Sequence, residues 1–179
     1  MATTFTSSQI RNIALAGHGH CGKTSIAEGL LFNAGATSRL GEAGTASSTF
    51  DFEPEEHARA GSISSAFGWF EHDGHKINVI DTPGDGNFIF DAFTSMRGAD
   101  TVAIVVSAVD GVEVQTERVY NHAVELGLPR IVLISKMDKE RANWEATLLD
   151  IEESFGVKPV PLQVPLGQEE SFRGVISLF

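Results

Sequence analysis

The sequence is poor in several features that would place it in other protein classes. Its single cysteine, Cys21, cannot form a disulfide within the chain, so we expect a reducing compartment. No apolar run approaches the roughly 20 residues that a membrane-spanning helix requires. The N-terminal segment MATTFTSSQIRN lacks the charged and apolar regions of a secretory signal. Together these absences favour a cytoplasmic protein without a membrane partner.

Positive charge is also scarce. The chain has 13 lysine and arginine residues against 24 aspartate and glutamate residues, a formal net charge of −11 at pH 7. This balance argues against a broad basic surface for direct, sequence-specific binding of nucleic acid, and leaves open a local contact with an RNA machine. The length of 179 residues suits one domain, and a hydrophobic content of 42% is ordinary for a soluble globular protein.

What the sequence does contain is an alternation of apolar strands and helical patterns. The expected strands are 10–16, 101–108 and 130–135, all read as buried, and the expected helices are 23–32, 88–96, 116–126 and 144–155. Leu148, Leu149, Ile151 and Phe155 would form the inward face of the last helix. This alternation predicts an α/β fold with a mostly parallel sheet and helices on both faces.

Two segments break the alternation. Residues 62–81 fit an antiparallel edge hairpin that turns at Asp73-Gly74, with Ile63, Phe67 and Trp69 on one side. Residues 33–61 have no clear periodicity, and a loop of this length inside a compact domain is usually functional or mobile. Its acidic patch, 53–56, is expected to be a solvated surface.

A phosphate-binding motif follows the first strand. The segment GHGHCGKT matches G-x-x-x-x-G-K-[ST] between an expected strand and an expected helix, as this motif requires. Its glycines let backbone N–H groups turn toward phosphate oxygens, and the start of the helix adds a positive end. Lys23 would reach the β and γ phosphates, and the Thr24 hydroxyl would bind Mg²⁺. The candidate phosphate-binding residues are Gly17, His18, Gly19, His20, Cys21, Gly22, Lys23, Thr24 and Ser25.

Two further groups complete a nucleotide site. Asp81 ends the strand INVID, where an acid in such proteins holds Mg²⁺, and Gly84 would give a backbone N–H to the γ-phosphate. After the strand RIVLI come Ser135, Lys136 and Asp138. The carboxylate of Asp138 can accept from both N1–H and N2–H₂ of guanine, a donor pair that adenine lacks, and the Lys136 stem can lie over the base. Taken alone, this last segment fits a plain strand-to-helix turn equally well; in series with the other motifs it favours guanine.

Four segments together resemble a known family. IRNIALAGHGHCGKT, DFEPEEHARAGSIS, INVIDTPGDGNF and PRIVLISKMDK occur in the order and spacing of the G domain of elongation factor G, over nearly the whole chain from about residue 10. The resemblance implies a P-loop NTPase G domain over 10–157, after an N-terminal extension at 1–9. Residues 158–179 resemble the start of that factor's inserted subdomain, here truncated, so we expect a piece of a longer factor.

The resemblance also implies an activity. A translational GTPase would bind GTP and GDP with Mg²⁺, hydrolyse GTP on the ribosome, and change conformation in two loops, at about 36–64 and 82–97. We name these the first and second loops. Ser62 falls at the position of the Mg²⁺-binding threonine of the first loop, so the expected metal ligands are Thr24, Ser62 and Asp81.

The departures from the family concern catalysis. The family's catalytic histidine follows Asp-Thr-Pro-Gly, where this chain has Asp85, and an aspartate of the phosphate loop is replaced by His20. Glycines, Gly19 and Gly61, stand where the family has two apolar residues that flank that histidine. Ser135 replaces an asparagine that braces the phosphate loop, which should weaken binding without changing the base.

Two readings of Asp85 follow. A carboxylate about 5 Å from the γ-phosphate would oppose the transition state by roughly 3 kcal/mol at an effective dielectric of 20, about a hundredfold in rate. Alternatively, His20 supplies the imidazole and Asp85 orients it, an acid–histidine pair in exchanged positions. The candidate catalytic residues are therefore Asp85, His20 and Lys23.

Three functions compete. The first is a GTP hydrolase of the elongation factor G type. The second is a GTP-binding switch with little or no turnover, because the catalytic position is altered. The third, a P-loop ATPase or small-molecule kinase, fits only the phosphate-binding motif.

Overall fold

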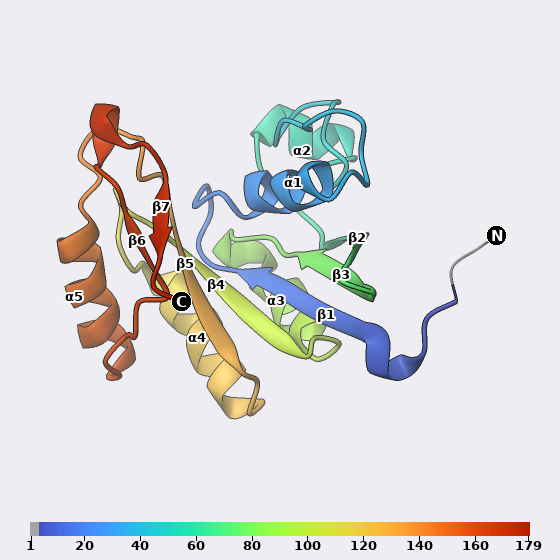
Figure 1. Cartoon of the computed structure of the whole chain (residues 1–179). Helices are drawn as coiled ribbons and strands as arrows, with labels where there is room; N and C mark the ends of the chain where they lie inside the picture. The colour runs from blue at the N-terminus through green and yellow to red at the C-terminus, as the bar shows by residue number, and fades with distance from the viewer. Residues whose placement is uncertain (1–3) are drawn as a thin grey trace.

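The structure, a computed structural model, describes residues 4–179 as strands that alternate with helices (Figure 1). Residues 1–3 of the expected N-terminal extension lie outside the described residues. In chain order the elements are η1 (Ser7–Gln9), β1 (Ile10–Ala16), α1 (Lys23–Asn33), α2 (Pro54–Arg59), β2 (Ala66–His72), β3 (His75–Asp81), η2 (Gly86–Phe88), α3 (Ile89–Met96), β4 (Thr101–Ser107), α4 (Val114–Glu125), β5 (Arg130–Ser135), α5 (Trp144–Phe155), β6 (Gln163–Pro165), η3 (Glu169–Ser171) and β7 (Val175–Ser177).

The main sheet has five strands in the order β2-β3-β1-β4-β5. β1 pairs in parallel with β3 and β4, β4 pairs in parallel with β5, and only β2 runs antiparallel, to β3. The mostly parallel sheet and the antiparallel edge hairpin predicted from the sequence are therefore confirmed. The register places Leu15 opposite Asp81 and Ser107 opposite Ser135, so the carboxyl ends of these strands meet at one edge of the sheet. Ligands of open parallel sheets bind at that edge.

Two apolar clusters cover the two faces of the sheet. On one face, α1 and the segment around Phe50 pack against β1, β2 and β3, and Figure 1 shows α1 and α2 on this side. On the other face, α3, α4 and α5 pack against β1 and β4. A Cβ at Gly68 would lie 2.7 Å from the Phe50 ring, so a glycine here lets the ring approach the β2 backbone closely. The prediction of helices on both faces is thus confirmed.

Several details differ from the sequence-based predictions. Strand β5 is an edge strand and is only partly buried, because no further strand covers its outer side among residues 4–179. On α5, Leu149 is exposed, and the buried positions are Thr147 and Ile151. The spacing of apolar residues predicts which residues share one side of a helix. It does not show how much of that side the neighbouring elements cover, so it could not predict that Leu149 is exposed.

The C-terminal segment adds a second, smaller sheet that packs against the rest of the described chain. β6 and β7 pair antiparallel as a separate two-stranded sheet, which Figure 1 shows beside β5 and α5. Phe172 packs against a small cluster of Ala108, Met137 and Ala142 beneath it. No helix among residues 4–179 combines the length and apolar character needed to cross a membrane.

Candidate nucleotide-binding site

The loop between β1 and α1 is shaped by its glycines. Gly17 has φ +151°, and a Cβ there would lie 2.4 Å from the Val105 carbonyl oxygen, so the loop can approach β4 only as glycine. Gly22 is the N-cap residue of α1, with φ +100°. The tight loop leads directly into the start of α1, where unpaired backbone N–H groups and the helix dipole favour an anion.

Lys23 is buried at the start of this helix. Its Nζ donates to the His18 carbonyl oxygen at 2.7 Å, which holds the ammonium over the loop. The second loop crosses at the same point, because a Cβ on Gly84 would lie 2.4 Å from both the His18 oxygen and Lys23 Nζ. Gly84 is therefore the residue that lets the second loop reach the phosphate loop.

Four side-chain oxygens form a connected row beside Lys23. Thr24 Oγ1 donates to Asp81 Oδ2 at 2.7 Å and lies 3.3 Å from Ser62 Oγ, which in turn donates to Asp51 Oδ1 at 2.7 Å. Asp81 Oδ1 is buried without a hydrogen-bond partner. Burial raises the pKa of the Asp81 carboxyl to about 7.

This row fits Mg²⁺. A buried carboxylate oxygen without a partner, next to two hydroxyls, presents the hard oxygen ligands that Mg²⁺ prefers. Across residues 4–179, no group of three or more His, Cys, Asp or Glu side chains could hold a metal by itself. Phosphate oxygens and water would have to complete the coordination, as they usually do for Mg²⁺ at a nucleotide. The structure brings Thr24, Ser62 and Asp81 together, and their role as metal ligands stays a prediction.

Buried carboxylates hold the first loop in place, and the sequence-based prediction missed them. Asp51 Oδ2 accepts from Gly44 N at 2.7 Å, and fully buried Glu28 on α1 accepts from Ser48 Oγ at 2.8 Å and from Thr49 N. Glu56 is also buried: its Oε1 accepts from Ile63 N at 2.9 Å. The expectation that the whole patch 53–56 is solvated is therefore wrong.

The segment predicted to read the base, residues 135–138, begins at the end of β5. Ser135 Oγ donates to the Cys21 carbonyl oxygen at 2.6 Å, so the serine does brace the phosphate loop. Lys136 has φ +58°, and its Nζ lies 3.3 Å from Asp110 Oδ2. Asp138 is exposed and lies 3.1 Å from Lys139 Nζ, and a hydrogen bond from Lys139 lowers the pKa of its carboxyl. Asp110 is a further residue that the sequence did not reveal.

Two phosphate-loop side chains are structural. His18 is buried, its Nδ1 lies 3.2 Å from Thr116 Oγ1, and burial lowers its pKa, so the imidazole is neutral at pH 7. Cys21 is fully buried, and burial raises the pKa of its thiol despite the nearby helix start.

A pocket of about 280 Å³ lies between the phosphate loop and the first and second loops. His20, Lys23, Thr24, Ser62, Arg59 and Asp85 are among the residues that line it. His20 and Asp85 are therefore in the same pocket, but no hydrogen bond or ion pair joins them in the described part of the chain. Asp85 instead caps η2, accepting from Asn87 N at 2.8 Å, and pairs with Arg59 Nη2 at 3.2 Å. Arg59 was not among the residues predicted for the site.

This chain is similar to known proteins over nearly its whole length. Residues 8–174 match the family model described as the elongation factor Tu GTP binding domain. The chain is 38% identical to elongation factor G 1 of Geobacter sulfurreducens over 170 residues, and 37% identical to elongation factor G 2 of Syntrophus aciditrophicus over 171. These matches cover 95% and 96% of this chain, which spans about a quarter of the length of either relative. A crystal structure of a protein from Thermus thermophilus superimposes with a TM-score of 0.89 at 34% identity, over 97% of this chain and 26% of that one.

Proposed function

Since this chain belongs to the elongation factor Tu GTP-binding domain family, we propose that it binds GTP and GDP with Mg²⁺ as the G domain of an elongation factor G-type GTPase that hydrolyses GTP on the ribosome. The observation that carries the proposal is the buried Thr24–Asp81 contact beside Lys23, with one Asp81 oxygen left without a partner. The G domain would be 10–157, and 158–179 would begin an inserted subdomain. The cytoplasm is the expected compartment.

Each residue of the site would have a distinct part in binding. The N–H groups at the start of α1 and the Lys23 ammonium would hold the β and γ phosphates. Thr24, Ser62 and Asp81 would hold Mg²⁺, whose charge offsets that of the phosphates during transfer of the γ-phosphoryl group to water. Asp138 would accept from guanine, with Lys136 along its face. Ser62 lies in the first loop, so it would contact the ion only while that loop is closed.

Hydrolysis would have to proceed without a histidine at the position of Asp85. A free carboxylate there would oppose the transition state, but Arg59 contacts it at 3.2 Å and offsets its charge. Lys23 and Mg²⁺ would supply most of the stabilisation. His20, which lines the same pocket, stays a candidate for orienting the attacking water.

The second candidate function is a GTP-binding switch with little or no turnover. One observation favours it: both oxygens of Asp85 have partners, Asn87 and Arg59, so this side chain is engaged in holding the loops. The binding residues are the same in both functions. Only the fate of the γ-phosphate differs.

Multiple-turnover GTP hydrolysis by the full-length protein that contains this sequence, with and without ribosomes, tests the proposal. We expect turnover that ribosomes stimulate. A wild type that binds GTP but stays silent with ribosomes, beside an Asp85→His variant that gains activity, would establish the switch instead. His20→Ala tests the exchanged pair, because unchanged activity removes His20 from the mechanism. Equal competition by ATP and GTP would overturn both functions.

A further inference from the structure

An ion pair connects the first loop to the second loop beside the pocket. Arg59 is the last residue of α2 in the first loop, and Asp85 lies in the second loop, before η2. Arg59 Nη2 and Asp85 Oδ2 are 3.2 Å apart, and both residues line the pocket that contains Lys23 and Thr24. The pair therefore joins two segments that both line the pocket proposed to hold the nucleotide.

Both ends of this pair are held in place by other contacts. The guanidinium carbon of Arg59 lies 5.3 Å from the centroid of the Phe88 ring. The Asp85 carboxylate accepts from both Asn87 N and Asn87 Nδ2, each at 2.8 Å. An exposed ion pair is usually weak, since two long side chains lose freedom when they meet. Here the contacts with Phe88 and Asn87 have already restricted both side chains, so less freedom is lost.

We infer that Arg59 and Asp85 form a latch that holds the first loop against the second and slows the release of bound nucleotide. The inference rests on the proposed function, because it assigns a regulatory role at the same site. Both residues are positioning residues: they act on the loops and on Gly84, which packs against Lys23. The latch joins the two loops in their closed arrangement, so it slows the release of GTP and acts on GDP only while the loops stay closed. In this chain Asp85 is thus a loop contact at a position that the family uses for catalysis.

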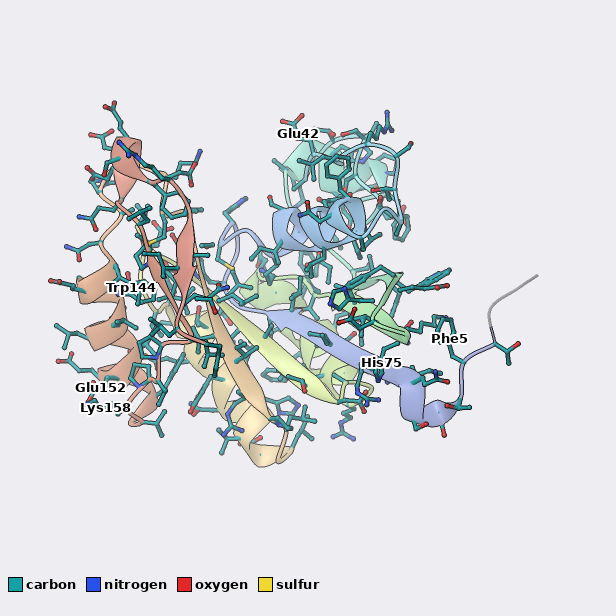
Figure 2. All side chains as sticks on the ribbon, in the orientation of Figure 1. Phe5, Glu42, His75, Trp144, Glu152 and Lys158 are labelled. Carbon is teal, nitrogen blue, oxygen red and sulfur yellow. The ribbon has the colours of Figure 1, made fainter. Side chains whose placement is uncertain are left out.

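Charge-removing variants that keep the local structure provide the test. Asp85→Asn keeps an N-cap residue at the start of η2 and removes the charge, since asparagine caps as well as aspartate. Arg59→Gln removes the charge on the other side, and Arg59→Lys keeps it. Arg11→Ala and Asp73→Ala are matched controls, because within residues 4–179 Arg11 donates to nearby carbonyl oxygens and Asp73 lies at the hairpin turn. In Figure 2 that turn, marked by His75, is far from the first loop, marked by Glu42.

The measurement is the dissociation rate of fluorescent GDP and GTP analogues from the full-length protein with Mg²⁺ present. We expect Arg59→Gln and Asp85→Asn each to release the GTP analogue about threefold to fivefold faster, in the range of one ion pair. The double variant should be no faster than the single ones, Arg59→Lys should retain most of the slow release, and high salt should reduce the difference.

The possible failures are distinguishable. Effects that multiply in the double variant, or rates unchanged from wild type, would overturn the latch while leaving nucleotide binding intact. A wild type that binds neither analogue would overturn the proposed function itself. Faster release from Arg11→Ala or Asp73→Ala would show that the effect comes from net charge, and this too would overturn the latch.

Discussion

The two ends of the site differ in how deeply they are buried. At the phosphate end, Lys23, Thr24 and Asp81 are 6%, 9% and 1% exposed. At the base-reading end, the side chains of Lys136 and Asp138 are 29% and 55% exposed. The phosphate end lies between β1 and β3 inside the sheet, whereas the base-reading end follows β5 at its edge.

This difference has electrostatic consequences. Burial raises the pKa of Asp81, so that a cation is needed to keep its carboxylate charged near neutral pH. In contrast, a hydrogen bond from Lys139 lowers the pKa of solvated Asp138, which stays charged without any ligand. We infer that the phosphate end contributes most of the affinity, and that the base-reading end contributes selectivity through weaker, screened contacts.

The largest expected effect comes from removing the buried charge. Lys23→Ala should weaken GTP and GDP binding by at least a hundredfold, about 3 kcal/mol, because the phosphates would lose their buried cation. Titration calorimetry measures this, with Lys76→Ala on the hairpin as a control for the loss of one lysine. A loss below tenfold would mean that the buried end does not dominate the affinity.

A smaller effect is expected from protonation of Asp81, which should make Mg²⁺ affinity rise with pH. With a pKa of about 7, the carboxyl holds a proton at pH 6 that Mg²⁺ must displace, whereas at pH 8 it is already charged. Mg²⁺ affinity of the GDP complex should therefore rise about tenfold from pH 6 to pH 8 and then level off. Mg²⁺ titrations at several pH values check this. In Asp81→Asn, the rise of Mg²⁺ affinity between pH 6 and pH 8 should disappear. If that variant shows the same rise as wild type, the titrating group belongs to the nucleotide and not to Asp81.

The smallest effect concerns Ser135, which connects the two ends. Ser135→Ala removes the hydrogen bond to the Cys21 carbonyl oxygen, so GTP and GDP affinity should both fall about fivefold, or roughly 1 kcal/mol. Equilibrium binding of both nucleotides tests this. A loss confined to GTP would contradict a bracing role, since the phosphate loop contacts phosphates that both nucleotides share.

Much of the site was predictable because its chemistry is local in the sequence. The spacing from Gly17 to Thr24 fixes a strand, a tight loop and a helix start within one short segment, and the structure has all three. Asp81 and Ser135 end strands that the apolar patterns identified, and parallel pairing brings those ends to one edge. The structure does bring Thr24, Ser62 and Asp81 together.

The missed residues lie in segments without periodicity. Asp51, Glu28 and Glu56 read as ordinary acids, since nothing in the sequence distinguishes a buried carboxylate with backbone donors from a solvated one. Arg59 and Asp85 are 26 residues apart, and their contact depends on how two irregular loops meet.

Phe67 and Trp69 share one face of β2 as predicted, and both are exposed.

By itself the sequence determined the main strands and helices between residues 10 and 155 and the phosphate loop, because each depends on spacing within a few residues. The tertiary structure alone decided which charges are buried and which are paired. It raised the pKa of Asp81 by enclosing it between strands, and it gave Asp85 the partners Arg59 and Asn87. The burial of a side chain and the pairing of its charge depend on neighbours from distant segments of the chain, so no local sequence pattern predicts them.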